Sequence, residues 1–170
     1  MGSLQYLTFT RLDIAFVVNY VRQFMTSPTD VHIAAVKRIL RYLQGTIQAG
    51  ICYSATAEVS LNAFSDVDYA TDLNTRRSLT CYEVFLGSKP ISWQSKKQNS
   101  VSRSSTKVDY KTLAHTAADI TWERYILKDL NVFLPHPPMI HCDNMYAISL
   151  SANPVFHSRI KHLDTDYHFV

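Results

Sequence analysis

Three aspartates stand where the sequence pattern predicts the ends of strands and the start of a long helix. Asp66 closes a strand-like run, Asp109 falls in the first turn of the long helix, and Asp143 closes the strand that follows it. Carboxylates held close together raise each other's pKa, so such a set suits a hard divalent cation, Mg²⁺ or Mn²⁺. Two such ions about 4 Å apart activate a water and stabilise the leaving oxygen in phosphodiester cleavage.

Each aspartate also has an ordinary structural role open to it. Asp66, like Asp68 two residues later, is a residue type favoured in turns. Asp109 fits the positive end of a helix dipole, and Asp143 fits a helix N-cap. Taken one at a time, these structural roles are the commoner ones. The joint placement of the three residues at one end of one sheet is what favours a metal site.

The first fifty residues have a helical pattern. The stretches Thr10 to Asp13 and Ser27 to Asp30 each place a hydroxyl three residues before an acid, which predicts helices near 11–24 and 28–44. The second helix carries an apolar stripe made of Val36, Ile39, Leu40 and Leu43. Residues 1–50 are therefore expected to form a helical unit of their own.

From about residue 51 the apolar residues alternate with a period of two, which indicates strands. Strands are expected at 59–66, 80–86 and 91–94, with a short turn from Gly87 to Pro90. A helix follows at 105–130, then a strand at 139–142, a short helix at 144–151 and a helical tail at 161–170. Residues 51–170 are thus predicted to form an α/β domain, in which a three-stranded antiparallel meander and a parallel fourth strand are flanked by helices.

Composition excludes several other classes of protein. The chain has 170 residues and 46% hydrophobic content, enough for one core and a helical appendage. Its three cysteines, Cys52, Cys81 and Cys142, are odd in number and widely spaced, which argues against a disulfide framework or a structural zinc site. The sequence shows neither a long apolar run nor a signal peptide pattern, so we expect a soluble, intracellular chain without a membrane partner.

The positive charge gathers in clusters although the net charge is only +3. Such clusters are most often solvated faces, and phosphate binding is the alternative. The clusters considered for nucleic acid are Arg76, Arg77, Lys96, Lys97 and Arg103.

Four stretches of the sequence are distinctive: F-S-D-V-D-Y-A (64–70), T-R-R-S-L-T-C-Y-E-V-F-L-G (75–87), S-R-S-S-T-K-V-D-Y-K-T-L-A (102–114) and H-C-D-N (141–144). They resemble the ribonuclease H domain of one known family, the copia-type retrotransposon polyproteins. Residues 4–16 and 37–46 resemble the segment that connects the reverse transcriptase to that domain, and residues 153–170 resemble the helical stretch after the third carboxylate.

This resemblance implies a ribonuclease H-like fold and a two-metal hydrolase that cleaves the RNA strand of RNA:DNA hybrids during reverse transcription. By position, Asp66, Asp109 and Asp143 match the family's first three carboxylates, which bind Mg²⁺ or Mn²⁺. The basic clusters would contact the hybrid backbone. The resemblance also implies the polyprotein's reverse transcriptase portion as a partner and a cytoplasmic location within virus-like particles, with the nucleus as the alternative.

The sequence departs from the family pattern at the second carboxylate. Asp109 stands where the family has Glu, and Lys107 replaces a neighbouring Glu. A side chain shorter by about 1.5 Å is expected to weaken metal binding, since such sites tolerate about 0.5 Å of misplacement. The family's final strand and C-terminal helix, which carry a fourth Asp, are expected to be missing. The histidines 157, 162 and 168 do not share one helical face and so make a weak metal set.

Whether the chain is an active enzyme is therefore left open by the sequence. One alternative is a non-catalytic retroelement remnant that at most binds nucleic acid. Another, which the order of the matching stretches disfavours, is the core of an integrase or transposase.

Overall fold

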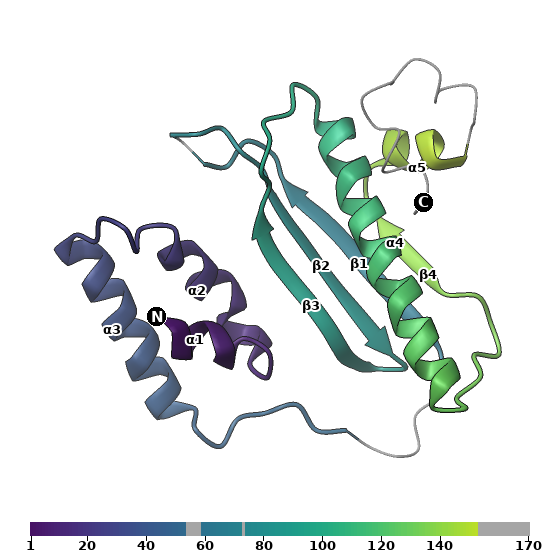
Figure 1. Cartoon of the computed structure of the whole chain (residues 1–170), viewed down its shortest axis with the longest axis horizontal. Coiled ribbons are helices and arrows are strands. Elements are labelled where there is room, and N and C mark those ends of the chain that lie inside the picture. Colours follow the sequence, from purple (N-terminus) through teal and green to yellow (C-terminus); the bar gives the residue numbers. More distant parts are fainter. Residues whose placement is uncertain (54–58, 73, 153–170) are drawn as a thin grey trace. The chain divides into compact units, whose positions relative to one another are not determined.

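The computed structural model of the chain describes residues 1–53, 59–72 and 74–152 (Figure 1). The chain divides into two compact units, Met1–Ser54 and Ala55–Val170, which we call the helical unit and the sheet unit. The predicted tail helix at 161–170 lies outside the described residues. In the part of the chain that is described, none of the helices combines the length and the apolar character needed to cross a bilayer.

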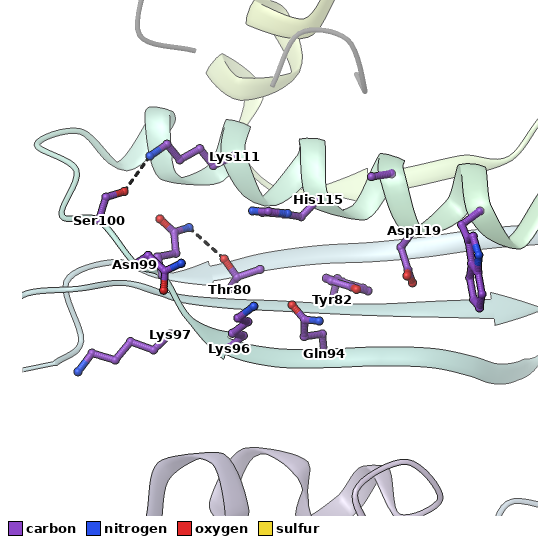
Figure 2. A pocket seen from close by; sticks show the side chains of 13 residues that line it. Thr80, Tyr82, Gln94, Lys96, Lys97, Asn99, Ser100, Lys111, His115 and Asp119 are labelled. Atoms are coloured by element: carbon purple, nitrogen blue, oxygen red, sulfur yellow. Dashed lines mark hydrogen bonds between the residues drawn. The ribbon is translucent and has the colours of Figure 1, made fainter. Parts of the chain in front are cut away.

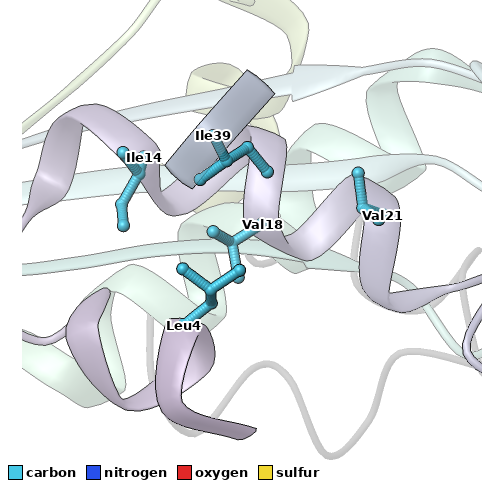
Figure 3. Packing of buried hydrophobic residues seen from close by; sticks show 5 residues of the cluster. All are labelled: Leu4, Ile14, Val18, Val21 and Ile39. Carbon is cyan, nitrogen blue, oxygen red and sulfur yellow. The ribbon is translucent and has the colours of Figure 1, made fainter. Parts of the chain in front are cut away.

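The helical unit packs three α-helices and a 3-10 turn around a small apolar core. Its elements are α1 (Gly2–Leu7), the 3-10 turn η1 (Leu12–Ile14), α2 (Ala15–Arg22) and α3 (Asp30–Gly45). The sequence pattern did not predict α1. Figure 3 shows the buried side chains of the core, which are Leu4, Ile14, Val18, Val21 and Ile39.

The helix starts in this unit differ from the predicted ones. The Thr10 hydroxyl donates to the carbonyl of Leu7 (3.2 Å) and so closes α1 instead of opening the next helix. The N-cap of α3 is Thr29, whose N–H donates to Nδ1 of His32 (3.0 Å). The predicted apolar stripe of α3 is narrower than expected, because Leu40 is half exposed.

A polar cluster fastens η1 to the end of α3. The Arg11 guanidinium donates two hydrogen bonds to the Asp13 carboxylate (2.9 and 2.7 Å), and the Tyr42 hydroxyl donates a third (2.8 Å). Arg11 also donates to the carbonyl of Thr46 (3.0 Å), just past α3. The hydrogen bond from Arg11 is the main reason that the pKa of Asp13 falls to about 2.

The sheet unit contains one mixed sheet with the strand order β3-β2-β1-β4. β1 (Leu61–Asp68), β2 (Leu79–Leu86) and β3 (Lys89–Lys97) form the antiparallel meander, while β4 (Met139–Cys142) runs parallel to β1. This arrangement confirms the predicted α/β fold.

Two helices complete the sheet unit. α4 (Ser105–Asp129) runs along the sheet and α5 (Met145–Ala152) follows β4 (Figure 1). The core between α4 and the sheet is formed by Leu61, Ala63, Val84, Ile120 and Leu127.

The hairpin between β2 and β3 is tighter than predicted. Leu86 pairs with Lys89, which leaves Gly87 and Ser88 as a two-residue turn. Gly87 has a φ of 61°, a conformation that glycine adopts without strain and that matches the twist of a hairpin. β3 therefore starts earlier than expected and includes Pro90, which an edge strand can accommodate beside an irregular register.

Replacing Asp13 by asparagine is expected to lower the melting temperature at pH 7 by no more than about 4 °C, because partly exposed ion pairs stabilise weakly. The pKa of Asp13 is lower in the folded chain than its ordinary value of 3.8. Its pairing therefore contributes above pH 3.8 and is lost as the pH falls through about 2. The measurement is thermal unfolding of both proteins from pH 7 to 2.

The matched control is Asp30→Asn, which removes an acid from the first turn of α3. A difference between the wild type and Asp13→Asn that is as large at pH 2 as at pH 7 would contradict the assigned role of the Arg11–Asp13 pair.

Candidate functional site

The parallel pairing of β1 with β4 brings two of the three aspartates together. Ser65 in β1 is the register partner of Cys142, the last residue of β4. Asp66 and Asp143 are the next residues along these two strands, which run in the same direction. Both aspartates therefore lie at the same end of the β1–β4 pair. The prediction that Asp66 closes its strand is wrong, because β1 continues to Asp68 and Asp66 pairs with Cys81 of β2.

Asp109 reaches this end of the sheet from α4. It is the fifth residue of the helix, so the prediction that it lies in the first turn is wrong, and the first turn contains no acid. The effect of the helix dipole fades beyond the first turn. Asp109 is only 7% exposed. A buried carboxylate there is costly, and the helix dipole does not account for it.

Asp109 lies beside Asp143 and a thiol that the sequence had not indicated as a site residue. The carboxylate oxygens of Asp109 and Asp143 and Sγ of Cys142 all lie within 4.8 Å of one another. Burial raises the pKa of Asp109, a hydrogen bond from Asn144 opposes this, and the charges of Asp143 and Asp66 raise the pKa further. The charge of Asp66 thus affects the cluster, although Asp66 is not one of the three residues whose ligand atoms lie within 4.8 Å of one another.

Asn144 positions the cluster and was also missed by the sequence interpretation. Its Nδ2 donates to Oδ2 of Asp109 (2.7 Å). Its Oδ1 accepts the backbone N–H groups of Tyr146 (3.0 Å) and Ala147 (3.1 Å), which makes Asn144 the cap of α5. The capping role considered for Asp143 therefore belongs to its neighbour. The sequence signal for this cap was the Asp-Asn pair just before an apolar helical run.

A polar groove of about 630 Å³ lies between α4 and the β2–β3 side of the sheet (Figure 2). Lys111, His115 and Asp119 contribute from one stripe of α4, since they are four residues apart. Lys96 and Gln94 contribute from β3. Asp109 lies about 200° around α4 from Lys111. The cluster includes Cys142 of β4 and the groove is lined by β2 and β3, at the other side of the sheet, so the two features lie on opposite flanks of α4.

Hydrogen bonds hold the groove's polar lining in place. Lys111 Nζ donates to the Ser100 hydroxyl (3.0 Å), and the Gln98 amide donates to Thr80 Oγ1 (3.0 Å). The carboxylate of Asp119 accepts from the Ser92 hydroxyl (2.7 Å). The groove thus combines ammonium groups with an acid that already has a partner.

The five basic residues predicted to bind nucleic acid divide between the groove and the exposed positions outside its lining. Lys96 and Lys97 line the groove, while Arg76, Arg77 and Arg103 are exposed and are not among its lining residues. Lys97 also forms an ion pair with Asp72 and so ties the end of β3 to the loop after β1. Arg76 lies in that loop with a φ of 53°.

The three histidines of the tail, His157, His162 and His168, lie outside the described residues.

The sheet order, the parallel fourth strand and the flanking helices define a ribonuclease H-like fold, with a carboxylate cluster at the end of its central strands. Comparison with known proteins then shows which proteins the chain is similar to. The chain is 50% and 51% identical, over its whole length, to the retrovirus-related Pol polyproteins from transposons RE2 and RE1 of Arabidopsis thaliana. It is 37% identical over its whole length to the Pol polyprotein from transposon TNT 1-94 of Nicotiana tabacum.

The chain is thus similar over its whole length to a part of these retrovirus-related Pol polyproteins. It spans 12% of the length of the two Arabidopsis proteins and 13% of the Nicotiana protein. No family model matches the chain, and no solved structure does.

Replacing Asp109 by asparagine is expected to stabilise the chain at pH 7 by about 1 kcal/mol, because it removes a charge that burial disfavours. The folded pKa of Asp109 is raised, so its ionised form costs stability above that pKa, and the cost disappears as the pH falls to the ordinary value of 3.8. The measurement is thermal unfolding of both proteins at pH 7 and pH 3.5. Asp68→Asn, at an exposed position at the end of β1, is the control. Destabilisation by Asp109→Asn at pH 7 would contradict this expectation.

Proposed function

We propose that this chain carries the ribonuclease H activity of a transposon Pol polyprotein, which hydrolyses the RNA strand of RNA:DNA hybrids. The observation that supports the proposal most strongly is Asp109, a buried carboxylate on α4 that lies beside Asp143 and is coupled by charge to Asp66. Carboxylate oxygens of Asp109 and Asp143 lie within 4.8 Å of each other, and the pKa of Asp109 is raised mainly by burial and further by the charges of Asp143 and Asp66. A cation fits such a site.

The resident ions in this proposal are Mg²⁺ or Mn²⁺, held by Asp66, Asp109 and Asp143. When bound, they would supply activation of a water and charge stabilisation at the leaving oxygen. The chain's own part is to fix the ligands. Asn144 orients Asp109 through its hydrogen bond and is itself held in place as the cap of α5. The strand register sets the separation of Asp66 and Asp143.

Binding of the hybrid would rest on phosphate contacts from cations. The groove on the other flank of α4 offers Lys96 and Lys111, and the exposed Arg103 lies just before that helix. Such contacts give affinity without reading the sequence, which suits an enzyme that must act along a whole hybrid. In the intact polyprotein, the reverse transcriptase portion is the proposed partner that delivers the hybrid.

The first test is cleavage of a hybrid with a labelled RNA strand in Mg²⁺ or Mn²⁺. We expect cleavage that falls at least about 100-fold in Asp66→Asn, Asp109→Asn and Asp143→Asn, because each variant removes a proposed metal ligand. Asp109→Glu is expected to raise the rate by up to about 100-fold, because its longer side chain restores the family's reach.

Asp68→Asn is the matched control, since it removes an acid two residues after Asp66 at an exposed position of the same strand. Its cleavage rate should stay close to that of the wild type. If neither the wild type nor Asp109→Glu cleaves the hybrid in either ion, the proposed activity is wrong, and binding without cleavage would favour a non-catalytic remnant.

The second test separates phosphate contacts from other surface charges. Lys96→Gln and Lys111→Gln are each expected to weaken hybrid binding and to reduce the slope of log K against log salt by about 1. The control is Lys128→Gln, in the last turn of α4, outside the residues that line the groove. Equal slopes for all three variants and the wild type would show that the groove does not contact the hybrid. Affinity would be measured by fluorescence anisotropy over a range of salt concentrations.

A further inference from the structure

Cys142 adds a sulfur atom to the carboxylate cluster, and sulfur is not a ligand that hard cations such as Mg²⁺ prefer. Its Sγ lies within 4.8 Å of carboxylate oxygens of both Asp109 and Asp143. Ligands about 2.0–2.3 Å from a tetrahedral Zn²⁺ are about 3.3–3.8 Å from one another. Small side-chain movements would therefore bring the three atoms onto one ion.

The strand register explains why the thiol faces the helix. Ala63 pairs with Ile140, and both pack in the core that includes Leu127 of α4. Side chains two residues apart in a strand share a face, so Ser65 and Cys142, which form the next such pair, point to the same side of the sheet as α4. Asp109 approaches from that side. The thiol therefore belongs to the cluster because of the fold and not because of a chance side-chain rotation.

Ser65 supplies a second, independent observation. It is 5% exposed, and its hydroxyl has no hydrogen-bond partner among the described residues. A buried hydroxyl without a partner costs about 1–3 kcal/mol, so such a group calls for an explanation. As the register partner of Cys142 on the same face, Ser65 is placed to donate to a metal-bound thiolate or to a water on the ion.

We propose that Asp109, Cys142 and Asp143 form a binding site for a thiophilic divalent ion of the Zn²⁺ class. Thiolate sulfur selects such ions over Mg²⁺, and zinc also accepts carboxylate oxygen. Binding breaks the S–H bond of Cys142, forms a metal–sulfur bond and releases the proton to the solvent. Where the proposed nuclease function holds, this ion competes with Mg²⁺ for Asp109 and Asp143 and inhibits cleavage.

Cadmium is the probe for the test, because a cadmium–thiolate bond gives an ultraviolet charge-transfer absorption that carboxylate binding alone does not. Titration of the whole chain with Cd²⁺ should produce this absorption and saturate at one equivalent, even with Mg²⁺ in excess. Cys142→Ser should abolish it, and Asp143→Asn, which keeps the thiol, should weaken Cd²⁺ binding at least about tenfold. Zn²⁺ should displace Cd²⁺ from the wild type.

Cys81→Ser is the matched control, since Cys81 is also a partly buried strand cysteine but lies in β2. The proposal is overturned if the absorption is absent in the wild type, if it survives in Cys142→Ser, or if Cys81→Ser removes it. Far-UV circular dichroism of each variant checks folding, and Asp143→Asn gives an answer even if Cys142→Ser does not fold.

The cadmium titration and the cleavage assay test the two proposals separately. Cadmium binding at Cys142 without any cleavage in Mg²⁺ or Mn²⁺ would retain the thiol site and refute the nuclease. Cleavage without a cadmium–thiolate signal would retain the nuclease and refute the thiol site. When both occur, Zn²⁺ should inhibit the wild type at concentrations at least about tenfold below those needed for Cys142→Ser.

Discussion

The parallel pairing of β4 with β1 is the constraint on which the candidate site depends. It sets Asp143 beside Asp66, and it places Cys142 beside Ser65 on the face toward α4. A slip of one residue would turn every side chain of β4 to the other face. β4 has only four residues, so its register depends strongly on Ile140, which packs against the core of the central strands. A short strand can hold a site in place when one partly buried apolar side chain packs against the core at the right position.

The buried face of α4 near Asp109 includes two other polar side chains, Thr112 and Thr116, among its apolar residues. The hydroxyls of Thr112 and Thr116 donate to carbonyls one turn earlier (3.1 and 2.8 Å), and Thr112 also contacts Thr80 of β2 (3.1 Å). These groups satisfy one another, so they are buried at little cost. Asp109 lies at the start of this run with one hydrogen bond from Asn144, and the repulsion from its acidic neighbours remains. A bound cation would offset both the cost of burying this carboxylate and the repulsion from Asp143 and Asp66.

Local patterns predicted the strands of the meander and the long helix because alternation and turn residues act within a few positions. They could not show that Cys142 faces the site, since the face of a four-residue strand is decided by its partner's register. α1 is six residues long, too short for a helical period to appear. The cap of α3 depends on His32, an imidazole in place of the Glu or Gln of a usual capping box. The burial of Asp109 is what distinguishes a site residue from an acid that only interacts with the helix dipole. Burial depends on the tertiary structure, so no local sequence pattern could predict it.

The two flanks of α4 differ in the sign of their charge, and this difference bears on how a polyanion could be bound. Lys96 and Lys111 on the groove side attract phosphates whether or not a metal ion is present. On the opposite flank, Asp66, Asp109 and Asp143 repel phosphates until a cation reverses the local charge. Under the proposed function, a hybrid could therefore be held by the groove side first, while approach of the scissile phosphate would depend on which ion occupies the carboxylates. The identity of that ion, hard or thiophilic, would then decide between a bound hybrid and a cleaved one.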